Sequence, residues 1–156
     1  NMIPLKDDII VIDDCYNANP ASMEASLSVL ALAAGRKIAV LGDMGELGEN
    51  EKELHARVGR AAAKNRIDIL YCAGTLSAEL AQAALEGGCR QVHHYADRQE
   101  LIQNLLPAVR AGDAILVKAS HFMEFPEVVE ALKEHLKKDG PTSSDAAIGK
   151  TAGQDG

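Results

Sequence analysis

Short apolar segments alternate with longer amphipathic segments along most of this chain. The apolar segments have the length of strands, whereas the amphipathic ones repeat apolar residues every three or four positions, as helices do. The pattern predicts strands at 9–12, 37–41, 69–72, 91–94 and 114–118, and helices at 22–33, 49–64, 77–86, 97–106 and 125–137. This regular alternation predicts an α/β fold with a three-layer, doubly wound, mostly parallel sheet of five or six strands, Rossmann-like in architecture.

The chain changes character after Lys138. Residues 139–156 hold a single isoleucine and no aromatic residue, which is too little apolar surface to offset the entropy lost on ordering. We therefore predict one domain over residues 1–138 and a disordered tail over residues 139–156.

Composition narrows the class of protein. Apolar residues make up 47% of the 156 residues, yet there is no Trp and only two Phe, so the core is expected to consist of Ala, Leu, Ile and Val. The formal net charge of -7 argues against nucleic acid as a partner, because binding phosphates needs an excess of Lys and Arg. No apolar run reaches the ~20 residues of a membrane span, and the N-terminus lacks a signal-peptide pattern. We expect a soluble, cytoplasmic domain.

Cysteine and histidine usage predicts no metal site. The three cysteines, Cys15, Cys72 and Cys89, are an odd number without C-x-x-C spacing, which favours free thiols over a disulfide or a zinc site. His93 and His94 are neighbours on a predicted strand, so they point to opposite faces and cannot act as paired ligands.

Polar side chains follow the first predicted strand. Asp14, Tyr16, Asn17 and Asn19 come directly after the run Ile9-Ile10-Val11-Ile12, which is typical of a strand buried on both faces. Open α/β sheets bind ligands at the carboxyl ends of such strands, so these four residues are candidates for ligand contact. The alternative is a plain strand-to-helix turn in which Asn19 only caps the helix that begins near Pro20.

A second loop, at residues 42–48, is rich in glycine but acidic. A carboxylate facing a triphosphate would repel it unless Mg²⁺ lay between them. The alternative is that the glycines permit a tight turn, with Glu46 or Glu49 capping the next helix. His55, within that helix, is either a surface or satisfied structural histidine or a catalytic candidate.

A third loop, Lys118-Ala119-Ser120-His121, follows the last predicted strand. It is expected at the same edge of the sheet as the other two loops, so that the three converge on one crevice. Lys118 can bind a carboxylate or a phosphate as a point charge. The alternative is a lysine that extends from a strand end into solvent.

Three motifs, taken together and in order, resemble the C-terminal domain of the Mur ligase family. They are DDCYNANPASM at 13–23, GDMGELG at 42–48 with His55 after it, and LVKAS at 116–120 with EVVEAL at 127–132. Among the members of the family, the sequences of these motifs resemble those of the ligase that adds D-alanyl-D-alanine to UDP-N-acetylmuramoyl-tripeptide. The resemblance covers residues 9–136. It departs in the third motif, where the family usually has Lys-Gly-Ser-Arg and this chain has Ala119 and His121.

The resemblance implies an ATP-dependent amide ligase of peptidoglycan synthesis. It implies that the first loop binds the nucleotide through Asp14, Tyr16, Asn17 and Asn19, and that Lys118, Ser120 and His121 bind substrate, with Lys118 and His55 as catalytic candidates.

The resemblance also implies that ATP and Mg²⁺ are held mainly by a central domain. No G-x-x-G-K-[ST] loop occurs in these residues, so we expect N-terminal and central domains of the same ligase as partners and no activity from this chain alone. Two other interpretations are a sibling Mur ligase for another amino acid and a non-catalytic nucleotide-binding module.

Overall fold

A computed structural model describes residues 1–138, and the tail predicted at residues 139–156 lies outside the described residues. The sheet has six strands in the order β1-β2-β6-β3-β4-β5. The strands are β1 (Met2–Pro4), β2 (Ile10–Asp13), β3 (Lys37–Gly42), β4 (Ile69–Ala73), β5 (Gln91–Tyr95) and β6 (Ala114–Lys118). The helices are α1 (Pro20–Leu30), α2 (Glu51–Lys64), α3 (Ser77–Glu86), α4 (Arg98–Leu105) and α5 (Pro126–His135).

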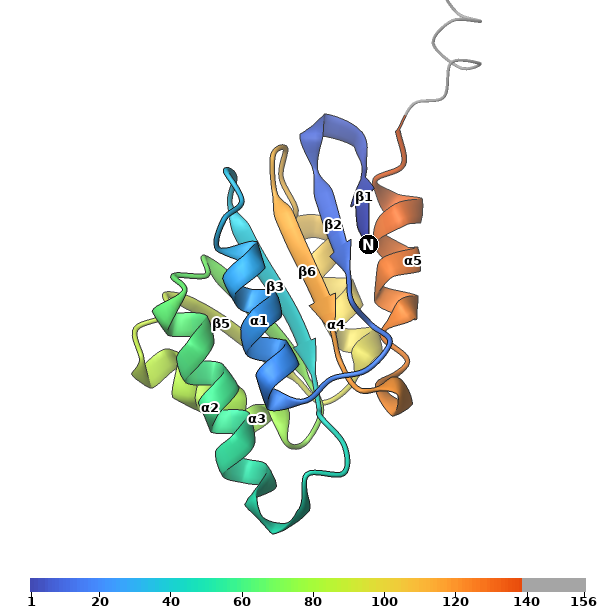
Figure 1. The fold of residues 1–156 in the computed structure, drawn as a ribbon. Helices are drawn as coiled ribbons and strands as arrows, with labels where there is room; N and C mark the ends of the chain where they lie inside the picture. The colour runs from blue at the N-terminus through green and yellow to red at the C-terminus, as the bar shows by residue number, and fades with distance from the viewer. Residues whose placement is uncertain (139–156) are drawn as a thin grey trace, which may run out of the picture.

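Five of the six strands run parallel, and the predicted fold class is confirmed. Each of the five predicted strands is present, with ends that differ by one residue at most. Figure 1 shows β2, β6 and β3 side by side, with their arrowheads at the same edge. This edge therefore carries the loops that the sequence singles out.

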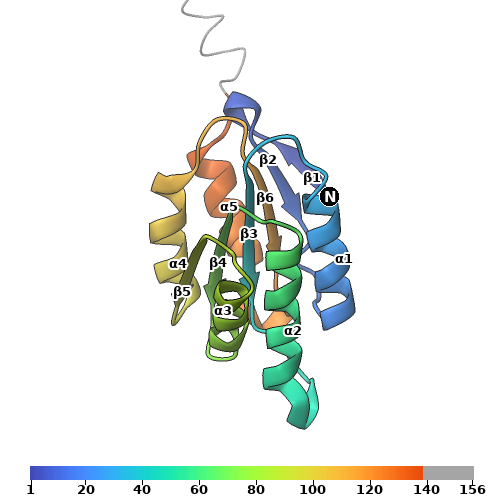
Figure 2. The ribbon, with the colours of Figure 1, turned by 90° about the vertical axis from the view of Figure 1, so that its left-hand side faces the viewer.

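The helices cover the sheet on two faces, as the alternation predicts. Figure 2 shows α1 and α2 on one side of the sheet and α4 and α5 on the other. The core is accordingly in two parts. In one part of the core, α1, α2 and α3 pack against one face of the sheet. In the other part, α4 and α5 pack against the opposite face. Aliphatic residues fill both parts, with Phe125 among the largest fully buried side chains.

The edge strand β1 was not predicted, because three residues that include Pro4 carry too little pattern to indicate a strand. It pairs antiparallel with β2, placing Met2 opposite Ile12.

The prediction that residues 9–12 are buried on both faces is wrong for one face. Val11 is buried on the face that α5 covers, but Ile10 and Ile12 are only half-buried. They line a hollow of about 570 Å³ beside the end of α1. The reason is that α1 lies over β6 and β3 rather than over β2.

Helices α2 and α3 approach closely because of one glycine. A Cβ atom at Gly59 would lie 2.1 Å from the Leu80 carbonyl oxygen and 3.0 Å from the Ala83 Cβ. A methyl group at this position therefore has no room.

We expect Gly59→Ala to destabilise the domain. The clash with α3 is expected to cost about 1–3 kcal/mol, outweighing a gain of about 1 kcal/mol in helix propensity. Urea unfolding followed by circular dichroism measures the difference. Lys52→Ala, on the exposed face of the same helix, is the control and should change stability by less than about 0.5 kcal/mol. A more stable Gly59→Ala variant would contradict this account of the packing.

Candidate functional site

Three loops leave the sheet at neighbouring strand ends. We call residues 14–19, after β2, the first loop; residues 43–50, after β3, the second loop; and residues 119–125, after β6, the third loop. The chain passes from β2 and β3 to α1 and α2 on one face but from β6 to α5 on the other, so a topological switch point lies here. Such points are where open α/β sheets bind ligands.

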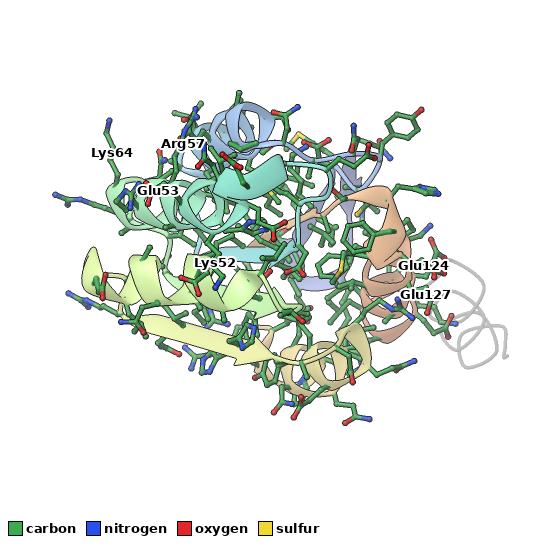
Figure 3. All side chains as sticks on the ribbon, turned by 90° about the horizontal axis from the view of Figure 1, so that it is seen from below. Lys52, Glu53, Arg57, Lys64, Glu124 and Glu127 are labelled. Carbon is green, nitrogen blue, oxygen red and sulfur yellow. The ribbon has the colours of Figure 1, made fainter. Side chains whose placement is uncertain are left out.

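Figure 3 views the molecule from this edge. Glu124 and Glu127, beside the start of α5, lie on one side of it, and Lys52 and Glu53, in the first turn of α2, lie on the other.

Ser120 joins all three loops. Its hydroxyl accepts a hydrogen bond from the Gly45 N–H at 2.8 Å and faces the Ala18 carbonyl oxygen at 3.4 Å. Its own N–H donates to the Asp43 carbonyl oxygen at 3.2 Å. The predicted convergence of the loops is therefore present. Ser120 is only 6% exposed. The primary role of its hydroxyl is therefore to hold the loops together, and contact with a substrate is secondary.

The side chain of Lys118 forms hydrogen bonds with the first loop. Its ammonium donates to Asp14 Oδ2 at 2.8 Å and to the Asn17 carbonyl oxygen at 3.1 Å. The Lys118 side chain is 3% exposed, whereas that of Asp14 is 42% exposed. The alternative of a lysine extending into solvent is therefore wrong. A buried ammonium needs such partners because desolvating an unpaired charge is costly.

Asp14 is ionised and held from two sides. The Ser26 hydroxyl of α1 donates to the same Oδ2 atom at 2.6 Å. Partial burial opposes ionisation, but hydrogen bonds from Lys118 and Ser26 outweigh it, so the pKa of Asp14 lies below its ordinary value of 3.8. The described contacts use Oδ2 and leave Oδ1 for another donor.

Sequence reasoning missed Ser26. Its position one helical turn after Ser22 was the available signal, since both serines then face the start of α1 and the loop before it.

The other candidates of the first loop differ in availability. Asn19 caps α1: its side chain accepts from the Ser22 N–H at 2.9 Å, and the Ser22 hydroxyl accepts from the Asn19 N–H at 3.1 Å. Asn19 therefore caps α1, as the alternative predicts, and its contact with a nucleotide stays a prediction. Asn17 Oδ1 accepts from the Ala18 N–H, while the side chain of Tyr16 extends outward and is 88% exposed.

The buried carboxylate of the second loop caps another helix. Asp43 Oδ1 accepts hydrogen bonds from the N–H and the hydroxyl of Ser77, at 2.8 and 2.7 Å, and Oδ2 accepts from the Leu76 N–H at 3.2 Å. These groups lie at the start of α3, where a carboxylate is favoured by unpaired N–H groups and by the helix dipole. Asp43 therefore does not fit the role of a Mg²⁺ ligand here.

His55 is fully buried, at 0% exposure. Its Nε2 atom accepts from the Met44 N–H at 3.0 Å, and Nδ1 lies 2.7 Å from the Glu51 carbonyl oxygen. Both ring nitrogens are therefore engaged within the fold, which agrees with the satisfied structural histidine that the sequence left open.

The third loop accommodates its departures from the family pattern. Ala119 is fully buried, and it fits because Gly42 has no side chain: a Cβ at Gly42 would lie 2.8 Å from the Ala119 Cβ. His121 is exposed and, with Phe122 and Glu124, borders a hollow of about 370 Å³.

All three cysteines are free and buried, and burial raises the pKa of the Cys89 thiol. No group of three or more His, Cys, Asp or Glu side chains suited to a metal was found within residues 1–138. Over the same residues, no helix is both long and apolar enough to cross a membrane.

The chain is similar to a known ligase family over most of its length. The family described as "Mur ligase, glutamate ligase domain" matches residues 1–121. The UDP-N-acetylmuramoyl-tripeptide--D-alanyl-D-alanine ligase of Bacillus subtilis is 35% identical over 136 residues, which are 85% of this chain and 30% of that ligase. The ligase of the same name from Escherichia coli is 38% identical over 135 residues, 85% of this chain and 29% of the relative. The chain thus spans about 30% of the length of these relatives.

Solved structures agree with the fold. A crystal structure of MurF from Acinetobacter baumannii has a TM-score of 0.77 at 29% identity, covering 86% of this chain and 30% of that one. The structure of MurF from Thermotoga maritima in complex with ADP has a TM-score of 0.73 at 27% identity, with coverage of 86% and 30%. These matches confirm the resemblance drawn from the three motifs.

We expect Asp14→Asn to reduce the loss of stability in acid. Because the folded pKa of Asp14 is depressed, its ionised form stabilises the fold above pH 3.8, and that contribution is lost as the pH falls through the folded pKa. Urea unfolding at about pH 6 and about pH 3 should show a smaller drop in the variant, by less than about 1 kcal/mol because solvent screens the half-exposed carboxylate. The control is Asp8→Asn, at another exposed carboxylate. Equal acid losses in wild type and Asp14→Asn would argue against this interaction.

Proposed function

We propose that this chain, which belongs to the Mur ligase family, is the C-terminal domain of an ATP-dependent amide ligase. The ligase would add D-alanyl-D-alanine to UDP-N-acetylmuramoyl-tripeptide in peptidoglycan synthesis. The names of the Bacillus subtilis and Escherichia coli relatives support this substrate pair. Because the chain spans about 30% of those relatives, the activity is proposed for the full-length ligase and not for this domain alone.

The observation that carries the proposal is the Asp14 carboxylate at the switch point of the sheet. Lys118 and Ser26 hold it in place, and its Oδ1 atom remains for a donor such as a ribose hydroxyl. Tyr16 and Asn17 lie beside it and are exposed, so a ring face and an amide are available to a nucleoside. The ADP in the Thermotoga maritima structure supports a nucleotide ligand for this fold.

The phosphates and Mg²⁺ are assigned to the central domain of the ligase. Within this chain, Asp43 is used to cap α3, and Lys118 is paired with Asp14. The partners of this domain are therefore the N-terminal and central domains of the same protein, and the free, buried thiols are compatible with a cytoplasmic location.

The resemblance implies a two-step reaction in the full-length ligase. ATP phosphorylates the tripeptide carboxylate, and the amine of D-alanyl-D-alanine then attacks the acyl phosphate, releasing phosphate and forming the amide. This domain contributes by positioning: it places the nucleoside and the dipeptide when it closes on the central domain. His121 and Phe122 are exposed side chains of the third loop beside the 370 Å³ hollow. They are the third-loop candidates for placing the dipeptide.

Nuclear magnetic resonance titration of this chain tests the proposal. ATP with Mg²⁺ and D-alanyl-D-alanine are each added while the backbone amides of the three loops are followed, with L-alanyl-L-alanine as the matched control ligand. We expect weak binding, with Kd on the order of 1 mM or ~4 kcal/mol, because the other domains complete the site. Asp14→Asn should weaken the response to ATP more than the response to the dipeptide.

Two results would overturn this function. Micromolar binding of ATP alone would indicate an autonomous nucleotide-binding module. Equal responses to D-alanyl-D-alanine and L-alanyl-L-alanine would argue against a dipeptide site at this edge and favour a sibling ligase.

A further inference from the structure

The ring of His55 lies fully buried between α2 and the second loop. Its two contacts are with the main chain only: the Met44 N–H at Nε2 and the Glu51 carbonyl oxygen at Nδ1. Met44 is itself buried, within the core part that contains α1, α2 and α3. Water therefore does not replace His55 as the hydrogen-bond partner of the Met44 N–H. A buried N–H without a partner costs free energy of folding.

The chemistry of these two partners determines the form of the ring. A backbone carbonyl oxygen only accepts, so Nδ1 must carry the hydrogen that faces Glu51. A backbone N–H only donates, so Nε2 must present its lone pair to Met44. His55 is thus a neutral imidazole in the Nδ1–H form. In a ring that carried a second proton at Nε2, the Nε2–H and the Met44 N–H would face each other as two donors without an acceptor.

The hydrogen bond to Met44 extends to the rest of the site. Gly45, the next residue, donates its N–H to the Ser120 hydroxyl, and Asp43, the preceding residue, accepts from the Ser120 N–H. Three consecutive residues of the second loop are therefore held by His55 on one side and by Ser120 on the other. Ser120 in turn faces the Ala18 carbonyl oxygen of the first loop.

We propose that His55 is a positioning residue whose Nε2 lone pair sets the second loop, and through Ser120 the third loop, for binding the acceptor dipeptide. The proposal rests on the proposed function as far as the dipeptide is concerned. His55 does not reach the reacting atoms, because it is buried and both of its nitrogens are engaged within the fold.

Two substitutions separate the two nitrogens of the ring. The amide of Gln reaches the place of Nε2 and can accept from Met44, whereas the shorter Asn reaches only the place of Nδ1 and can donate to Glu51. His55→Gln therefore retains the acceptor that the proposal requires, and His55→Asn retains the other contact. Both are polar, uncharged and buried, so a merely structural role of the ring would be affected similarly by the two.

The whole chain is labelled with nitrogen-15, and three quantities are measured for wild type and both variants. They are the amide shifts of Met44, Gly45 and Ser120 without ligand, the thermal midpoint, and the Kd for D-alanyl-D-alanine. In His55→Gln we expect these amide shifts to stay near their wild-type values and Kd to change less than about twofold. In His55→Asn we expect all three amides to shift and Kd to rise at least about tenfold. The long-range nitrogen-15 spectrum of the wild-type ring should show the neutral Nδ1–H form.

The outcomes can be told apart from failure of the proposed function. If the wild-type chain binds no dipeptide, the proposed function fails, while the ligand-free amide shifts still test whether Nε2 sets the loops. Equal amide shifts and equal Kd changes in the two variants would overturn the positioning role. The same conclusion holds if the Asn variant keeps wild-type shifts, or if the wild-type ring is doubly protonated. If His55→Asn fails to fold, a folded His55→Gln with wild-type shifts and Kd supports the proposal, and one with altered shifts overturns it.

Discussion

The hydrogen bonds of Ser120 hold the functional edge of this domain together. Parallel strands β2, β6 and β3 end side by side, but strand pairing alone leaves the loops that follow them free to diverge. Ser120 lies at the end of the central strand of the three and binds main-chain groups on both sides, at Gly45 and Asp43 and toward Ala18. Because its partners are backbone groups, the loops can differ in side chains and still keep this arrangement.

The two buried charged side chains at this edge, Lys118 and Asp43, have partners within the fold. Lys118 is buried and neutralised by Asp14, and Asp43 is used at the start of α3. Among the groups available to a ligand are one oxygen of Asp14 and the exposed side chains of Tyr16, Asn17, His121 and Phe122. A domain of this kind shapes and aligns a site more than it supplies charge to it, which suits a domain that completes a site held elsewhere.

Two residues of catalytic or metal-binding type, His55 and Asp43, have structural roles in the fold. His55 and Asp43 stand in motifs whose residue types permit catalysis or metal binding. In the structure, each accepts hydrogen bonds from main-chain N–H groups: His55 from the buried Met44 N–H, and Asp43 from the buried Ser77 N–H and the partly buried Leu76 N–H. A buried polar group without a partner is costly, so these motifs have a structural reason to contain a histidine and an aspartate.

The alternation of strands and helices, the three loops at one edge and the family resemblance could all be predicted from the sequence, because they depend on local periodicity and on contiguous motifs. The sequence also indicated the capping role of Asn19, since its partner Ser22 lies three residues away. The tertiary structure decided what local patterns do not contain. It paired β1 with β2, left one face of β2 partly open, and brought Lys118 to Asp14, 104 residues away along the chain. Which polar group meets which depends on how distant segments pack, and that packing decides which side chains remain for a ligand.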